Sequence, residues 1–167
     1  MKRFFLLMIL ILFTLSCEKG EHTVKIPKFL VNRAVEKKFP LEKNIVLARA
    51  NLSNPKVSFA DNRLIMDLDF KISAIGENTE GKMKVSSSVL YDSDKREVYL
   101  DNLSIDEIVN KDGSKVEKTK MYNIFNELLS NYMARKPVYT MEEKYKNYDI
   151  INIKIEKSGF YVVVNGK

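Results

Sequence analysis

Residues 63–74, RLIMDLDFKISA, carry the clearest strand pattern in the chain, because apolar and polar side chains alternate along most of their length. One face of this strand is wholly apolar and is made by Leu64, Met66, Leu68, Phe70 and Ile72. The other face carries Asp67, Asp69 and Lys71. Such alternation predicts a strand of an antiparallel sheet that has one covered face and one wet face.

Further strands are expected on both sides of this stretch. Residues 45–52 and 55–60 precede it as two strands or one bent strand, and 82–91 and 97–105 follow it, with a loop expected over 76–81. Lys82 and Lys84 would then oppose the two aspartates. This favours wet-face charges at Asp67 and Asp69 over the alternatives of a cation site or an acid–base pair.

Two helices are predicted from spacings of three and four between apolar residues. The shorter covers 29–39 and ends at Pro40, and the longer covers 115–135 and ends before Pro137. The apolar face of the longer helix comprises Met121, Ile124, Phe125, Leu128, Leu129 and Tyr132. With an edge strand over 23–26 and a closing hairpin over 149–165, this order predicts an α+β domain with both helices against one sheet face.

The first sixteen residues have the anatomy of an export signal. Lys2-Arg3 precede the apolar run 4–15, which is shorter than the roughly 20 residues of a membrane-spanning helix. Ser16 and Cys17, the sole cysteine, close the run in a pattern that resembles the lipobox of bacterial lipoproteins. The resemblance implies lipidation of Cys17 and anchoring in the bacterial cell envelope. Glu18, rather than Asp, follows the cysteine and favours the outer membrane, facing the periplasm.

The remaining chain is expected to be a lipidated tether over 17–22 and one α+β domain over 23–167. The whole sequence has a formal net charge of +6. Its positive and negative charges are interspersed along the chain, and this interspersion argues against a nucleic-acid partner. His22, the single histidine, lies in the tether, and Ser53-x-x-Lys56 lacks the helix and companion motifs of penicillin-binding enzymes. No zinc, calcium or phosphate-loop motif is present. We therefore expect no enzyme activity, no cofactor and no metal.

Four stretches resemble the YceB-like family of small bacterial lipoproteins, a domain of unknown function. They are the lipobox, the pattern VNRAV at 31–35, the hairpin 89–100, and Asn131-Tyr132 followed by Lys136-Pro137-Val138-Tyr139. The resemblance covers about residues 15 to 142. It implies half of a tubular lipid-binding fold, in which a strongly curved antiparallel sheet wraps around a long helix in the C-terminal half, with a shorter N-terminal helix. It carries over no catalytic residue.

Two hypotheses follow for the function. In the first, the sheet does not close fully on the long helix and leaves a slot for a lipid or other amphiphile, with Tyr132 and Tyr139 at its mouth. The residues of this predicted slot are Met66, Phe70, Met83, Phe125, Leu128 and Tyr132. In the second, these residues form a solid core, and the protein is an envelope scaffold that docks a protein partner. A packed core is the commoner outcome for such stripes.

Overall fold

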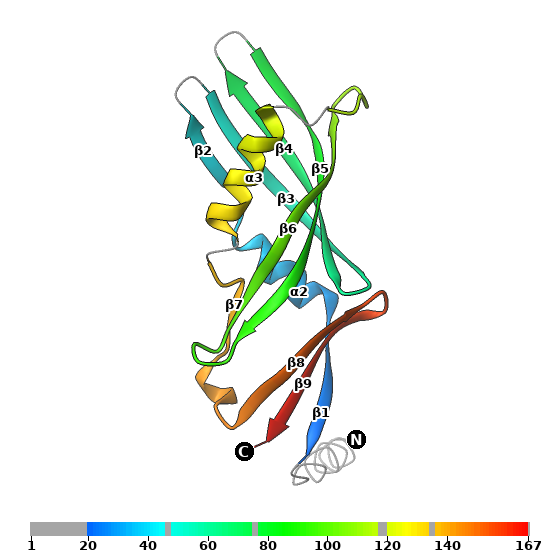
Figure 1. The fold of residues 1–167 in the computed structure, drawn as a ribbon, viewed down its shortest axis with the longest axis vertical. Coiled ribbons are helices and arrows are strands. Elements are labelled where there is room, and N and C mark those ends of the chain that lie inside the picture. The colour runs from blue at the N-terminus through cyan, green and yellow to red at the C-terminus, as the bar shows by residue number, and fades with distance from the viewer. Residues whose placement is uncertain (1–19, 46–47, 75–76, 117–119, 134–135, 167) are drawn as a thin grey trace, which may run out of the picture.

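The structure is a computed structural model that describes residues 20–45, 48–74, 77–116, 120–133 and 136–166. The expected signal peptide over 1–16 and Cys17 lie outside the described residues. The described part of the chain forms a six-stranded and a three-stranded antiparallel sheet, with two short α-helices (Figure 1).

The larger sheet has the strand order β2-β3-β4-β5-β6-β7. Its strands are β2 (Leu41–Ile45), β3 (Ala48–Ala60), β4 (Arg63–Ala74), β5 (Glu77–Asp92), β6 (Glu97–Asn110) and β7 (Tyr139–Thr140). The first five follow one another as hairpins, and β7 returns from far along the chain to pair with the start of β6. Each strand therefore packs beside its sequence neighbour, as adjacent runs joined by short turns favour.

Strand β4 confirms the prediction that the apolar residues of 63–74 form the covered face of a strand. Its alternating residues Leu64, Met66, Leu68 and Phe70 are all buried, with at most 2% of each exposed. Asp67 pairs with Lys84 and Asp69 with Lys82 on β5, as expected for opposite charges on the wet face. No acid–base pair is needed to explain these residues.

The smaller sheet has the order β1-β9-β8 and is built from both ends of the described chain. Strand β1 (Glu21–Ile26) and strand β8 (Tyr148–Glu156) flank the central strand β9 (Gly159–Gly166). The predicted edge strand and closing hairpin are therefore confirmed. Strand β1 begins at Glu21, within the segment that was expected to be tether.

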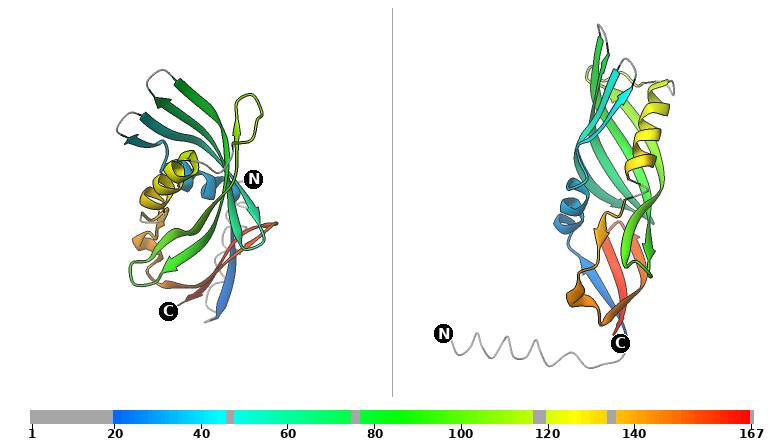
Figure 2. Two further views of the ribbon diagram at one scale, coloured as in Figure 1. Left: turned by 45° about the horizontal axis from the view of Figure 1, so that its top comes forward. Right: turned by 90° about the vertical axis from the view of Figure 1, so that its left-hand side faces the viewer.

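The two α-helices are α2 (Lys28–Glu36) and α3 (Lys120–Tyr132), and a 3₁₀ turn, η1 (Glu143–Tyr145), precedes β8. Helix α3 is shorter than the predicted 115–135 helix, because Lys115 forms a bridge with Val109 and is not helical. Figure 2 shows α3 lying along the six-stranded sheet. Helix α2 lies between the six-stranded and the three-stranded sheet along the long axis of the molecule.

The expected fold class is wrong. The domain is mostly β, its helices are short, and neither sheet is strongly curled or closed around a long helix. The physical reason lies in the last hairpin: β9 pairs with β1 on one side and with β8 on the other, so that these three strands form a separate sheet instead of extending a single sheet around α3.

Three local features complete the comparison: one alternative is confirmed, one prediction is wrong, and one strand was not predicted. The strand over 48–60 is one bent strand, with a bulge between Ser53 and Lys56 and Asn54 at a φ of 52°. The expected loop over 76–81 is wrong, since β5 begins at Glu77 and continues through Gly81. Strand β2 was not predicted, and it pairs residue by residue with the start of β3.

A single hydrophobic cluster joins the sheets and helices. On the large sheet it includes Leu52, Met66 and Val85, and Val35 of α2 and Phe125 of α3 complete it from the helices. Phe59 of β3 packs on Phe160 of β9 with 6.4 Å between ring centroids, which connects the two sheets. The core is therefore continuous along the molecule.

Candidate functional site

The structure places five of the six predicted slot residues in the packed core. Met66, Phe70, Met83, Phe125 and Leu128 each have at most 2% of their surface exposed. The Phe125 ring meets the Phe70 ring at a centroid distance of 5.2 Å and an interplanar angle of 64°. This arrangement is the edge-to-face packing that aromatic pairs prefer in a filled interior. These residues are brought together, and they fill the space between β4 and α3.

Of the two tyrosines expected at the mouth of the slot, the structure describes the side chain of Tyr139 only. Tyr132 is the last residue of α3, and its side chain lies outside what the structure describes. Tyr139 pairs with Val98 at the opposite end of β6 from the beginning of α3. Tyr139 is 40% exposed.

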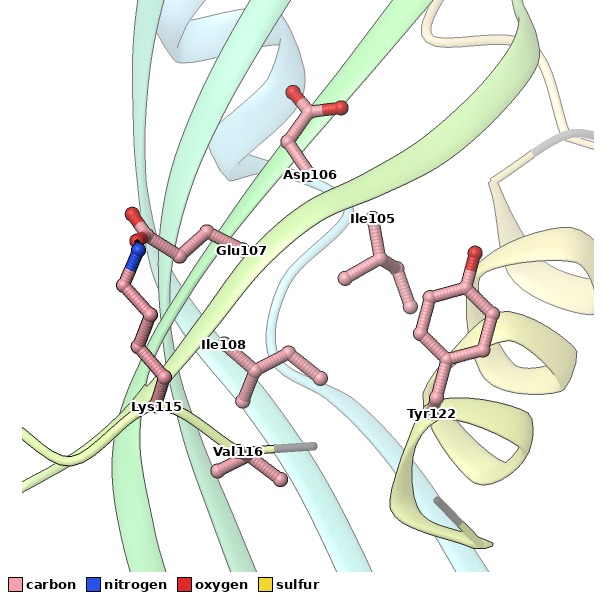
Figure 3. Close-up of a pocket in the computed structure, with 7 residues that line it drawn as sticks. All are labelled: Ile105, Asp106, Glu107, Ile108, Lys115, Val116 and Tyr122. Carbon is pink, nitrogen blue, oxygen red and sulfur yellow. Dashed lines mark ion pairs between the residues drawn. The ribbon is translucent and has the colours of Figure 1, made fainter. Parts of the chain in front are cut away.

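A pocket of about 140 Å³ lies instead at the seam between α3 and β6 (Figure 3). We call it the seam pocket, and it is lined by Ile105, Asp106, Glu107, Ile108, Lys115, Val116 and Tyr122. In Figure 3 the apolar side chains of β6 and Val116 extend toward the Tyr122 ring on α3. Val116 and Tyr122 are only half-buried, so that solvent reaches the pocket.

A β-bulge in β6 creates the apolar wall of the seam pocket. Ile105 pairs with Val85 and Ile108 pairs with Met83, although two residues three apart on a regular strand point to opposite faces. Asp106 has no residue opposite it on β5 and supplies the extra position. Because of this bulge, both isoleucines face α3.

Strand β6 and helix α3 form two walls of the seam pocket. The third wall is the segment in which the chain turns back after β6. Gly113, at a φ of 86°, lies in the turn, a conformation that glycine adopts without strain. The N–H of Val116 then donates to the carbonyl oxygen of Ile108 over 3.0 Å. On the other side of β6, Lys115 forms an ion pair with Glu107 at 2.9 Å. Together these contacts hold Val116 over the end of the pocket.

The polar residues beside the seam pocket are paired with one another. A hydrogen bond from Lys115, and secondly its positive charge, lowers the pKa of Glu107 below that of an ordinary carboxyl group. The hydroxyl of Ser86 donates to Asp106 Oδ1 over 2.9 Å. These charged groups therefore have partners of their own, and the surface of the pocket is mixed, with apolar parts from Ile105, Ile108 and Val116.

Helix α3 is held on both sides. Its buried face includes Phe125, Leu128 and Leu129, which lie in the main core. On its exposed side Glu127 forms an ion pair with Lys43 of β2. Packing in the core and the ion pair with β2 thus hold α3 in place, and with it the wall of the pocket that Tyr122 forms.

Among the described residues, the catalytic and metal-binding candidates do not come together in one site. His22 lies in edge strand β1, and Ser53 and Lys56 flank the bulge of β3 rather than a helix start. No three His, Cys, Asp or Glu side chains of the described ranges gather closely enough to hold a metal ion. Among the helices that the structure describes, none has the length and apolarity to span a bilayer.

The seam pocket was missed because alternation breaks within β6. The sequence Ile105-Asp106-Glu107-Ile108 places two polar residues between two apolar ones, which looks like the end of a strand. A doubled polar pair inside an otherwise alternating strand is also what a bulge produces. That signal could have predicted that both isoleucines share a face.

Comparisons with known proteins give a family and distant similarity to solved structures. A family model described as a protein of unknown function, DUF1439, matches residues 29–157. No curated protein matches the sequence. A structure titled "Crystal structure of lipopolysaccharide binding protein" aligns with a TM-score of 0.31 at 10% identity over 87% of this chain, which spans 40% of the length of that structure. The family model covers well over half of the residues, and the chain therefore belongs to the DUF1439 family.

Proposed function

We propose that the protein is a lipid-anchored lipoprotein of the bacterial envelope that binds the apolar end of an amphiphile in the seam pocket. The anchor is supported by the export signal over 1–16 and by Cys17 directly after it, which together resemble a lipobox. The four stretches that resemble the YceB-like lipoproteins support membership of that family, and Glu18 in place of Asp after the cysteine supports a place on the outer membrane, facing the periplasm.

The seam pocket is the observation that carries the proposed ligand. Its volume of about 140 Å³ is close to the ~150 Å³ of apolar cavities that bind benzene in proteins. It therefore suits the last few carbons of an acyl chain, or a small ring, rather than a whole lipid. Tyr122 has an apolar body and a polar tip, a residue type suited to the boundary between an acyl chain and water.

The predicted slot deeper in the core is a poor place for the ligand. Phe70 and Phe125 already fill it, and a ligand there would have to separate α3 from β4. The seam pocket needs no such separation, because Val116 and Tyr122 are partly exposed beside it. Binding at the seam thus leaves the main core intact.

A second candidate function is that of a scaffold that binds a protein partner. The packing of that core and the exposed apolar residues on α2 favour it. Phe29 and Leu30 are 67% and 45% exposed. Apolar side chains presented together on a surface are typical of protein docking sites. In this alternative the protein is a non-catalytic envelope scaffold that binds a protein partner. We propose no enzyme activity and no cofactor in either case.

Uptake of a fluorescent fatty acid by the purified protein separates these functions. The variant Val116→Phe adds a ring to the wall of the seam pocket, and Val24→Phe adds the same ring to edge strand β1. Amphiphile binding predicts saturable uptake by the wild type and Val24→Phe, and roughly tenfold weaker uptake by Val116→Phe, or about 1.4 kcal/mol. Equal uptake by all three proteins, or none by any, contradicts the assignment of the site.

A further inference from the structure

The end of the domain nearest the lipidation site carries a group of exposed tyrosines. Tyr139, Tyr145 and Tyr148 are 40%, 40% and 41% exposed, and we call this surface the tyrosine end. They come from β7, η1 and β8, three elements separated along the chain. Ile151, three residues after Tyr148 on edge strand β8, is 49% exposed.

Arg96 holds the tyrosine end together. Its Nη2 atom donates to the carbonyl oxygens of Tyr145 at 2.7 Å and Tyr148 at 3.4 Å. Its own carbonyl oxygen accepts from the N–H of Met141 over 2.9 Å. Tyr139 pairs with Val98, two residues beyond Arg96. The turn between β5 and β6 therefore ties the backbones of β7, η1 and β8, which carry the three tyrosines, to one end of β6.

The register of the small sheet places the tyrosine end level with the start of β1. Glu21, the first residue of β1, pairs with Asn165, and Asn165 pairs with Asp149, which follows Tyr148. Two strand spacings separate β1 from β8, or about 10 Å. In Figure 1 the start of β1, the end of β9 and η1 lie together at the lower end of the molecule.

The length of the tether sets how far this end can lie from a membrane. Only four peptide steps join Cys17 to Glu21, which extend to about 14 Å at most. A lipid on Cys17 would therefore keep the start of β1 close to the headgroup layer. Tyrosine is enriched at that layer, because its ring is apolar and its hydroxyl stays hydrated.

We propose that the tyrosine end rests in the interfacial layer of a phospholipid bilayer when the protein is anchored through Cys17. This inference rests on the anchor of the proposed function. Charges of both signs lie at this end, including Lys146 and Asp149, so that the tyrosines and Ile151 rather than net charge make the contact. The seam pocket lies toward the far end of β6 and is held away from the bilayer.

The absence of tryptophan from the sequence makes a direct test available. In the full chain, matured in bacteria, Tyr148→Trp places a single reporter at the tyrosine end. Phe29→Trp places a matched exposed reporter on α2, beyond the other end of β1. Each protein is reconstituted into vesicles of phosphatidylethanolamine and phosphatidylglycerol that contain a brominated phospholipid quencher.

The contact predicts that the Tyr148→Trp reporter is quenched about twofold more strongly than the Phe29→Trp reporter, as expected for an indole in the interface. Equal, weak quenching in protein that floats with the vesicles overturns the contact and leaves the anchor standing. Crosslinking of this end to a protein in intact cells, with the same weak quenching, also overturns it. Protein that lacks a diacylglyceryl mass on Cys17 and does not float contradicts the anchor and the contact together.

Discussion

The Phe125 ring of α3 packs edge to face on the Phe70 ring of β4, with 5.2 Å between the ring centroids. This pair joins α3 to the middle of the large sheet. It occupies the space in which the sequence predicted a lipid slot. At this position the two rings therefore pack against each other in the buried core.

The first prediction concerns that pair. Phe125→Ala should lower the free energy of unfolding by about 3–5 kcal/mol, because a fully buried ring is removed and a cavity remains. Phe29→Ala, at a 67% exposed position, should change it by less than about 0.5 kcal/mol. Urea denaturation followed by circular dichroism measures both. A loss at Phe125 as small as that at Phe29 would show that α3 is not packed on the sheet.

The second prediction concerns Gly81, where β5 passes close to β6. A Cβ atom at this position would overlap the carbonyl oxygen of Val109 and lie 2.8 Å from Asn110 Cα and 2.9 Å from Phe70 Cε1. Two of these neighbours are backbone atoms that cannot move without disturbing the strand pairing. Gly81→Ala should therefore destabilise the protein by about 1–3 kcal/mol.

Gly166→Ala is the matched control for Gly81→Ala. No atom lies within 4 Å of the Cβ that it would add, so the unfolding midpoint should hardly move. Thermal unfolding of both variants measures the difference. Equal midpoints would mean that β5 and β6 are farther apart at Gly81 than the structure has them.

The third prediction concerns the ion pair between Lys115 and Glu107, two of the residues that line the seam pocket. The hydrogen bond and charge of Lys115 lower the pKa of Glu107, so Lys115→Met should return that pKa to the usual carboxyl range. A carboxyl whose pKa is lower folded than unfolded stabilises the fold above its unfolded pKa. That stabilisation is lost as the pH falls through the folded pKa.

Acid should therefore destabilise the wild type slightly more steeply than Lys115→Met, and added salt should reduce the difference, because both groups are exposed. An NMR titration of the Glu107 carboxyl carbon measures the pKa directly. An unchanged titration in Lys115→Met would mean that the pair does not form in solution.

The fourth prediction concerns the bulge that builds the seam pocket. Deletion of Asp106 removes the extra residue, so that Ile105 and Ile108 can no longer both face α3 while the flanking pairs with β5 are kept. The variant should lose fatty-acid uptake and also stability. Ser86→Ala removes the hydrogen bond to Asp106 but keeps the bulge, and it should retain uptake.

Strands whose pattern is regular could be predicted from the sequence. The bounds of β4, the pairing of Asp67 with Lys84, and the final hairpin are all confirmed. Each depends on a local period of two and on short turns, which a single sequence displays directly.

The features that could not be predicted from the sequence depend on pairing between segments that are distant along the chain. The partner of the last hairpin is β1, at the other end of the domain, and nothing local in either segment specifies that pairing. The 115–135 helix was predicted too long because Lys115 and Val116 were counted as its first turn, whereas they pair back along β6. The seam pocket escaped prediction for the same reason, since it needs both that return and the bulge.

Native mass spectrometry of the mature full chain, purified from bacterial membranes, tests the proposed amphiphile binding most directly. The account predicts a non-covalent adduct of lipid mass on the wild type, which is released on denaturation and is missing from Val116→Phe. Wild-type protein that carries no adduct and takes up no added fatty acid or phospholipid would contradict it.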